Sequence, residues 1–307
     1  MICISLRKGT GMSKLSKQLV TLARQGGGGF KTIADRSKIA SRVAERIAKL
    51  NIQIRDVKHI KTNHIELYVK SRKAEGISKR TMQNEMAAIR NILTVAGRTK
   101  LADPGHEKLS NSALGLSDAS RDGTKVAISS ERYLAAFAYS DKQDVGVAAA
   151  MQVARCFGLR TEEAVQSVKS LKTWQRALSR GDDRVRIVFG TKGGRPRDTT
   201  VIDRDKMLSA VNHALKVAAE QNGKLVDKPD LKSAIDRYRN IVRDAGLVGK
   251  HAPHSLRYAW AGEAMEYHKS KGMSDDEAKA MVSMDLGHGD GRGRYIERVY
   301  NKPDIEE

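Results

Sequence analysis

The chain has 307 residues, 40% hydrophobic and 30% charged, which is enough for about two soluble globular domains. It carries 56 lysines and arginines against 36 acidic residues, and this excess favours a polyanionic partner. Nucleic acid is the first candidate partner, and the alternative is a ribosomal or simply a basic soluble protein. The 2 cysteines form no Cys-x-x-Cys motif, and no apolar run approaches about 20 residues. We therefore expect a cytoplasmic, prokaryotic protein without a disulfide framework, a signal peptide or a membrane partner.

The first 100 residues divide into a loosely ordered start and a helical region. Residues 1–30 are expected to be a flexible segment, because four glycines at 26–29 break the helix that residues 14–24 begin. From 31 to about 100, apolar residues at three- and four-residue steps predict three helices, with Asp35 and Ser78 as N-caps of the first and third. Their outer faces are basic, which predicts contacts with the DNA backbone from Arg42, Arg46, Lys79 and Arg80.

The rest of the chain is predicted to be a linker followed by a second domain. Residues 101–125 are rich in turn-forming residues and read as the linker, and residues 126–307 form the second domain. Residues 184–189 and 199–202 read as strands on either side of a turn of glycines and cations, which predicts a β-hairpin. Helices are expected from Ser130 and over 145–157, 206–222, 228–245, 255–267 and 275–284. The fold class is therefore α+β, mainly helical, with a small antiparallel sheet.

Three short motifs in this second domain carry cations suited to a phosphodiester. They are Gly158-Leu159-Arg160, His254-Ser255-Leu256-Arg257 and Leu286-Gly287-His288. A guanidinium offers a planar fork that matches two phosphate oxygens, and His254 and Arg257 share one face at the start of a helix. The histidines have no cluster of cysteines or carboxylates at ligand spacing, and no Walker-type loop is present. A metal site is therefore not predicted.

With these motifs in this order, residues 130–300 resemble the catalytic domain of tyrosine recombinases, the phage-integrase family. Residues 32–98 resemble the SAM-like, core-binding domain of that family, and the run from Leu286 to Tyr295 is similar to integrases of phages and integrative genomic islands. The resemblance implies site-specific cleavage and rejoining of duplex DNA through a 3′-phosphotyrosyl link, with no cofactor. It implies as partners attachment-site DNA, a homotetramer assembled on that DNA, and accessory DNA-bending or directionality factors.

The resemblance also assigns roles to the residues of the three motifs. Arg160 and Arg257 would hold the non-bridging oxygens of the scissile phosphate, and Glu163 would orient Arg160. His254 would act as a proton acceptor or phosphate ligand, and His288 would hydrogen-bond the phosphate.

The turn of the hairpin adds a further set of cations. Lys192 matches the position that protonates the departing 5′ oxygen as general acid. Arg195 and Arg197 share the turn, and we expect them to contact DNA phosphates.

The nucleophile is the one element displaced from its usual spacing. The family places a tyrosine about nine residues after the histidine, where this chain has Glu297. Tyr300 is favoured, because Val299-Tyr300 matches the family's ending and residues 289–294 read as a short insertion. Tyr295 is the alternative nucleophile.

Two other functions use a similar set of residues. A nicking-closing type IB topoisomerase shares the catalytic set and works as a monomer. A relative that binds DNA without cutting it would keep the basic surfaces alone.

Overall fold

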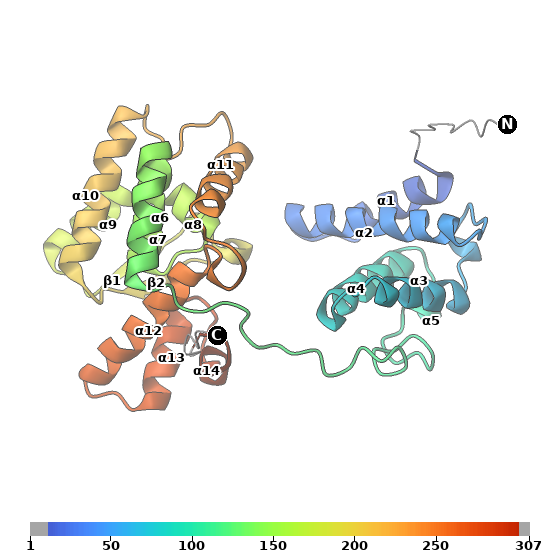
Figure 1. Cartoon of the computed structure of the whole chain (residues 1–307). Coiled ribbons are helices and arrows are strands. Elements are labelled where there is room, and N and C mark those ends of the chain that lie inside the picture. The colour runs from blue at the N-terminus through green and yellow to red at the C-terminus, as the bar shows by residue number, and fades with distance from the viewer. Residues whose placement is uncertain (1–11, 301–307) are drawn as a thin grey trace. The chain divides into compact units, whose positions relative to one another are not determined.

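A computed structural model describes residues 12–300 of the chain, which divides into two compact units, one ending at Ser120 and one beginning at Arg121 (Figure 1). The N-terminal unit is entirely helical within its described part. Its elements are α1 (Lys14–Gln25), α2 (Phe30–Lys49), η1 (Val57–His59), α3 (Thr62–Ala74), α4 (Lys79–Val95) and α5 (Thr99–Ala102). The Ser78 hydroxyl accepts from the backbone N–H of Thr81, which confirms the predicted cap of α4.

The expected flexible start is wrong for residues 12–30. Ser13 caps α1, and Leu15, Leu19 and Ala23 are buried in the core of the N-terminal unit. The glycine run ends α1 at Gln25, and α2 then begins at Phe30. Asp35 therefore lies inside α2 and does not cap it. The rest of that prediction, residues 1–11, lies outside the described residues.

The predicted linker is also shorter in the structure than in the sequence analysis. Leu109, Leu114 and Leu116 are buried in the same core as α1 to α4. Apolar side chains at these positions remove the segment from solvent, so residues 101–116 belong to the N-terminal unit.

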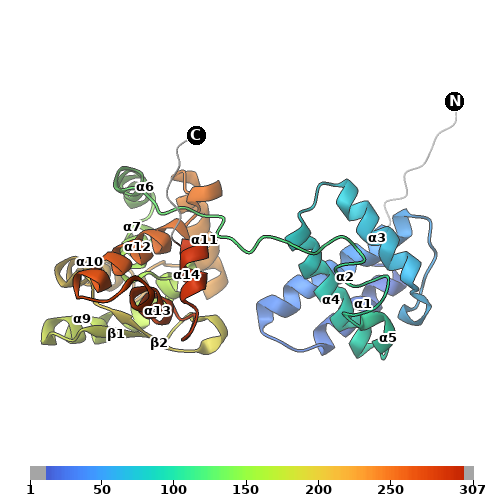
Figure 2. The ribbon, with the colours of Figure 1, turned by 90° about the horizontal axis from the view of Figure 1, so that it is seen from below.

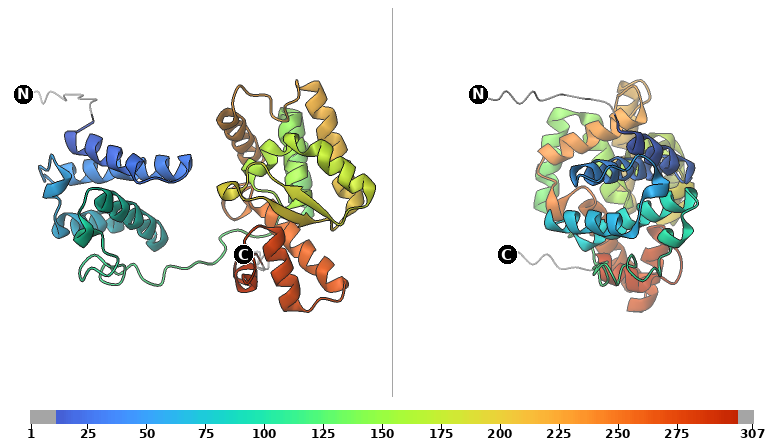
Figure 3. Two further views of the ribbon diagram at one scale, coloured as in Figure 1. Left: turned by 180° about the vertical axis from the view of Figure 1, so that it is seen from behind. Right: turned by 90° about the vertical axis from the view of Figure 1, so that its right-hand side faces the viewer.

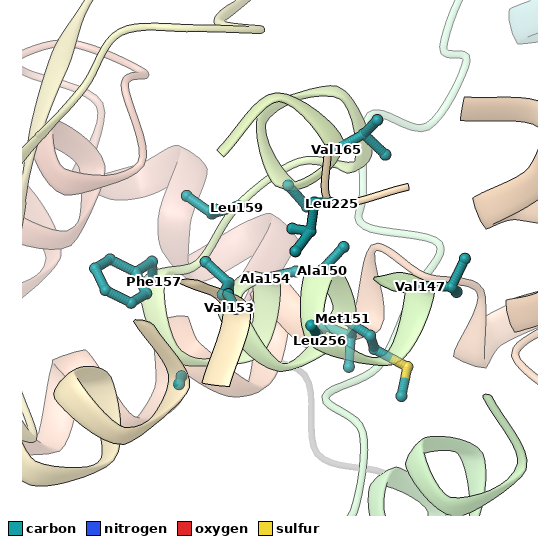
Figure 4. Packing of buried hydrophobic residues seen from close by; sticks show 14 of the residues in the cluster. Val147, Ala150, Met151, Val153, Ala154, Phe157, Leu159, Val165, Leu225 and Leu256 are labelled. Atoms are coloured by element: carbon teal, nitrogen blue, oxygen red, sulfur yellow. The ribbon is translucent and has the colours of Figure 1, made fainter. Parts of the chain in front are cut away.

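The C-terminal unit is built around one apolar helix. Its helices are α6 (Ser130–Gln143), α7 (Val145–Phe157), α8 (Thr161–Gln166), α9 (Leu171–Arg180), α10 (Arg204–Glu220), α11 (Leu231–Asp244), α12 (Ser255–Ser270), α13 (Asp275–Asp285) and α14 (Gly293–Tyr300). Short 3₁₀ turns follow α8 and α11, at η2 (Ser167–Lys169) and η4 (Gly249–His251), and η3 (Lys192–Gly194) lies in the turn of the hairpin. α7 is apolar on nearly every face, as a helix surrounded by others must be. Figure 4 shows its Val147, Met151 and Phe157 in the core with Leu256 of α12.

A two-stranded antiparallel sheet crosses this unit, as the sequence predicted. β1 (Arg184–Ile187) pairs with β2 (Arg197–Thr200), and Arg184 lies opposite Thr200. Figure 3 shows the hairpin beside the C-terminal helices, and β2 contacts α13. β2 begins two residues earlier than the predicted return strand at 199.

A second core lies between the last three helices. Trp260, Val282, Ile296 and Val299 are buried together there, and α12, α13 and α14 pack side by side (Figure 2). The sequence analysis missed α14 and treated residues 289–294 as an insertion, although Gly293 starts the helix. This small core sets the position of Tyr300 at the end of α14.

Candidate active site

A cleft in the C-terminal unit collects most of the predicted catalytic residues. Its lining comes from the start of α8, the hairpin turn and the start of α12, together with the segment between α13 and α14 and with α14 itself. The lining side chains include Arg160, Arg184, Lys192, Arg195, Arg197, His254, His288, Arg292, Tyr295 and Tyr300. Segments more than 100 residues apart in sequence therefore contribute to one site.

Arg160 is held where α7 gives way to α8. Gly158 ends α7 with a left-handed φ of 60°, and a Cβ there would lie 2.7 Å from the Trp260 ring, so glycine alone fits this turn. Glu163 accepts the backbone N–H of Arg160 at 2.9 Å and its Nη1 at 2.7 Å. Nη2 of Arg160 donates to the carbonyl of Leu286 at 3.1 Å. Local helix capping thus aims this guanidinium at the cleft.

Glu163 is a buried carboxylate shared by three arginines. Besides Arg160, its Oε2 lies 2.8 Å from Nη2 of Arg197 and 3.9 Å from Nη1 of Arg257. Burial alone would raise the pKa of Glu163, but the charges of Arg197, Arg257 and Arg160 outweigh it and lower the pKa to about 2. Three positive charges and one negative charge leave this cluster at +2, a field suited to an anion.

Arg257 lies behind the cleft surface, fully buried. Its Nη1 donates to the carbonyl of Gly158 at 2.5 Å, and its Nη2 donates to the carbonyl of Leu286. Its Nε–H points at the hydroxyl of Tyr300, 3.4 Å away. Burial lowers the pKa of Arg257 to about 10, so it stays charged at neutral pH.

Tyr300 and His288 form the closest pair of reactive groups. Nε2 of His288 lies 3.0 Å from Oη of Tyr300. Burial, together with the charges of Arg257 and Arg160, lowers the pKa of His288 to about 3, so its imidazole is neutral at pH 7. Because Arg257 can only donate, Oη accepts from it and keeps its own proton for His288. Tyr300 is therefore arranged to donate a hydrogen bond to His288.

His254, at the N-terminus of α12, is the second neutral histidine of the cleft. Burial, with the charges of Arg257 and Arg160, lowers its pKa to about 4. The centre of its ring lies 6.3 Å from that of Tyr300 and 5.6 Å from that of Tyr258.

The two candidate nucleophiles have different surroundings. Tyr300 is 5% exposed, and its hydroxyl has the two partners described above. Tyr295 is 38% exposed, and its ring centre lies 4.7 Å from that of His288. Burial, and the neighbouring Tyr300, raise the pKa of Tyr295, which disfavours its oxyanion.

Lys192 stands at the exposed turn of the hairpin, as expected. Gly193 and Gly194 follow it with φ near 70°, which allows the chain to turn sharply there. Arg195 is exposed on the same turn, in keeping with a role at a phosphate. The ammonium of Lys192 is also one of the charges that lower the pKa of His288.

The structure contradicts the prediction that Arg197 contacts DNA. Its side chain is buried, and its guanidinium donates to Glu163, to Thr199 and to the carbonyls of Asp285 and Gly158. These hydrogen bonds occupy Nη1 and Nη2 and hold the hairpin against the segments around Glu163 and Asp285.

Arg42 and Arg46 form ion pairs in the N-terminal unit, and their contact with DNA stays a prediction. Arg42 pairs with the buried Glu85 at 2.7 Å, and Arg46 pairs with Glu75. Glu85 also accepts from Arg72, so these cations belong to an ionic cluster that joins α2, α3 and α4. Lys79 and Arg80 are exposed at the start of α4, where they remain candidates for DNA contact.

A second buried carboxylate, Asp285, escaped the sequence analysis. Its Oδ1 accepts from Arg184 at 2.8 Å and from Thr200 Oγ1 at 2.9 Å, and its Oδ2 lies 3.1 Å from His268 Nε2. The only local signal was its place directly before Leu286-Gly287-His288. Asp285 ties the hairpin to the segment that carries His288.

Two absences hold for the described part of the chain. Among residues 12–300, no group of three or more His, Cys, Asp or Glu side chains is arranged to hold a metal ion. None of the helices there combines the length and apolar character needed to cross a membrane.

Comparison with known proteins matches both units to one family. A family model described as "Integrase" matches residues 115–263, and one described as "Phage integrase, N-terminal" matches residues 12–102. No curated protein sequence matches the chain.

Solved structures share the fold. A lambda integrase dimer bound to a COC′ core site matches over 95% of this chain and 79% of its own, with 17% identity and a TM-score of 0.57. A lambda integrase tetramer bound to a Holliday junction matches over 95% of this chain and 80% of its own, with 17% identity and a TM-score of 0.53. At this identity the likeness describes the fold alone.

A helical domain followed by an α+β domain with a two-stranded hairpin is the fold of tyrosine recombinases. The chain belongs to the phage integrase family of these proteins. The family and fold predicted from the sequence are thereby confirmed.

Proposed function

We propose that the protein is a site-specific recombinase that cuts and rejoins duplex DNA with Tyr300 as nucleophile. The observation that carries this proposal is the pair of contacts at Oη of Tyr300, with His288 at 3.0 Å and Arg257 at 3.4 Å. A phenol with a pKa near 10 needs neighbouring cations or a base to attack a phosphodiester. Tyr300 has both.

The proposed cleavage step balances its protons within the cleft. Oη of Tyr300 attacks the scissile phosphorus, the bond from phosphorus to the 5′ oxygen breaks, and a 3′-phosphotyrosyl link forms. Neutral His288 accepts the tyrosine proton, and Lys192 gives a proton to the departing 5′ oxygen. Rejoining is the reverse, and it needs no added energy because the phosphotyrosyl bond conserves that of the phosphodiester.

The arginines would stabilise the charge that develops on the phosphate. Arg160 reaches the cleft, while Arg257 is covered and donates to Tyr300. We propose that a phosphate oxygen takes over the Nε–H of Arg257 as Oη moves onto phosphorus. Glu163 would position both guanidinium groups, because it contacts each of them.

The proposed partners are attachment-site duplex DNA and further copies of the chain. The net charge of +20 and exposed cations such as Lys79, Arg80 and Arg195 suit DNA-backbone contacts. Lambda integrase, which shares the fold, has been solved as a dimer on a core site and a tetramer on a Holliday junction. We propose a homotetramer on DNA that integrates or excises a mobile element.

A suicide duplex tests the proposal. Selection from a random duplex pool supplies a bound site, and a nick beside the cleavage position then traps the covalent intermediate. Wild type and Tyr295→Phe should give an adduct that resists SDS, and Tyr300→Phe should give none. A wild type that binds the site without an adduct would be a DNA-binding relative. Relaxation of a supercoiled plasmid lacking the site would instead indicate a topoisomerase.

A further inference from the structure

The described part of the helix that carries Tyr300, Gly293–Tyr300, is held by side-chain contacts with its neighbours. Ile296 and Val299 anchor it in the small core with α12 and α13. Glu297 adds an ion pair with Lys279 of α13 at 3.4 Å. These contacts hold one side of α14.

The chain that enters the C-terminal unit holds α14 at another point. Asp122 Oδ1 lies 2.5 Å from Nε of Arg298, and the backbone N–H of Gly123 donates to the carbonyl of Arg298 at 3.4 Å. We call residues 122–123 the strap. Both strap contacts fall within the last three residues of α14, next to Tyr300.

Gly123 has no room for a side chain. A Cβ there would lie 2.1 Å from the carbonyl oxygen of Val299 and 2.8 Å from Oη of Tyr258. Tyr258 in turn packs on Tyr300, with ring centres 4.5 Å apart. The strap backbone therefore lies directly against the carbonyl that precedes Tyr300 and against the ring that supports it.

Beyond the strap, the same segment is tied to the loop before α12 and to its first residue. Lys125 Nζ donates to the carbonyl of Gly249 at 2.7 Å, and Val126 N–H donates to that of Lys250 at 3.1 Å. Ile128 N–H donates to the carbonyl of Ser255 at 3.3 Å. The strap thus joins the end of α14 to the region of His254 and Arg257.

We propose that Asp122 and Gly123 are positioning residues for the nucleophile. They hold the end of α14 so that Oη of Tyr300 stays between His288 and Arg257. Neither strap residue lines the cleft that holds Arg160, Lys192 and Tyr300, so we propose that the strap acts through α14. This proposal rests on the proposed role of Tyr300.

Substitution of Gly123 tests the strap most sharply. Gly123→Ala must move the strap or α14, whereas Gly262→Ala is a matched control on α12, where a Cβ meets nothing within 4 Å. Because a misplacement of about 1 Å can cost about 100-fold, we expect Gly123→Ala to slow single-turnover adduct formation on the order of 10-fold. Its Kd for the same duplex should stay within about twofold of wild type, since the strap is not a DNA contact.

Charge reversal tests the ion pair. Asp122→Arg and Arg298→Asp should each slow adduct formation about threefold, as expected for an exposed pair, and the double variant should restore it. Failure of the double variant to recover, with both single variants slow, would overturn the role of the pair.

Amide hydrogen exchange of the free protein tests the role of the strap independently of the proposed catalytic role of Tyr300. Gly123→Ala should speed amide exchange over residues 295–300 about tenfold, and Gly262→Ala should leave it unchanged. Equal exchange rates and equal adduct rates in Gly123→Ala and wild type would overturn the proposed role of the strap. A loss of adduct in Gly123→Ala that is fully explained by weaker DNA binding would also overturn it. If wild type forms no adduct, the proposed function fails, and the exchange comparison still decides on the strap.

Discussion

The hydroxyl of Tyr300 lies 3.0 Å from Nε2 of His288, whose imidazole is neutral because burial and two nearby arginines lower its pKa to about 3. An imidazole that is neutral at pH 7 can accept the hydrogen bond of the phenol at this distance. The same hydroxyl accepts from Arg257, a cation whose other hydrogen bonds go to backbone carbonyls. The tyrosine is therefore held between a base and a cation by the protein itself.

The leaving-group proton gives the first prediction. Lys192→Ala should slow cleavage by about 100- to 10,000-fold, because the 5′ oxygen then departs without a general acid. A substrate with sulfur in place of that bridging oxygen has a far better leaving group and should restore the rate. Arg195→Ala, on the same turn, should show no such rescue. Equal slowing of Lys192→Ala on both substrates would assign the proton to another group.

A second prediction separates the two arginines that follow Lys192. Arg197→Met removes a partner of the buried Glu163 and should lower the free energy of unfolding by about 3–5 kcal/mol. Arg195→Met, at an exposed position, should change it by no more than about 0.5 kcal/mol. Urea unfolding measures both. Equal stabilities would contradict the structural role assigned to Arg197.

The basic surface of the N-terminal unit gives a third prediction. If Lys79 and Arg80 neutralise phosphates, replacing both with Ala should change the salt dependence of DNA binding. The slope of the logarithm of the association constant against the logarithm of the salt concentration should become about 1 to 2 less steep. Arg42→Met should leave that slope unchanged and lower the melting temperature instead, since Arg42 pairs with buried Glu85. A reduced salt slope together with an unchanged melting temperature in Arg42→Met would contradict its assignment to the ionic cluster.

The buried histidines predict how stability depends on pH. Burial and the charges of Arg257 and Arg160 lower the pKa of His254 to about 4 and that of His288 to about 3. An unfolded histidine titrates near pH 6.5, so the unfolded chain binds more protons below that pH. The stability that these groups contribute is present above about pH 6.5 and is lost as pH falls towards 4.

Thermal unfolding between pH 7.5 and 4.5 measures this loss. The melting temperature of the wild type should fall as the pH is lowered over this range. The melting temperature of His254→Gln should fall less steeply. His59→Gln, at an exposed position, should follow wild type. Identical slopes in His254→Gln and wild type would mean that His254 is not buried as a neutral group.

The motifs predicted from sequence were those whose residues are close in the chain. The group His254, Arg257 and His288 falls in one stretch, and the structure brings it together with Arg160 beside Tyr300. The fold class followed from helical periodicity and from two strand-like segments around one glycine-rich turn. The remaining contacts depend on pairs far apart in sequence, such as Arg42 with Glu85, and no local pattern carries them.

Arg197 illustrates why the rest was missed. The return strand was predicted to begin at 199, which left Arg197 in the turn, but β2 begins at Arg197 itself. Alternate strand residues share a face, so Arg197 lies on the buried face with Thr199. Two residues of error in a strand boundary thus changed a buried positioning arginine into an expected surface cation. By contrast, Leu15, Leu19 and Ala23 of α1 did carry a helical spacing, which the neighbouring glycines obscured.

Peptide mapping of the covalent adduct tests the central claim most directly. Arg298 lies between the two candidate tyrosines, so trypsin releases Tyr295 in the peptide 295–298 and Tyr300 in a separate peptide that starts at Val299. After nuclease trimming of the trapped adduct, mass spectrometry should find the nucleotide on the peptide that starts at Val299. A nucleotide on the peptide 295–298 would contradict the account, because the attack would then come from Tyr295.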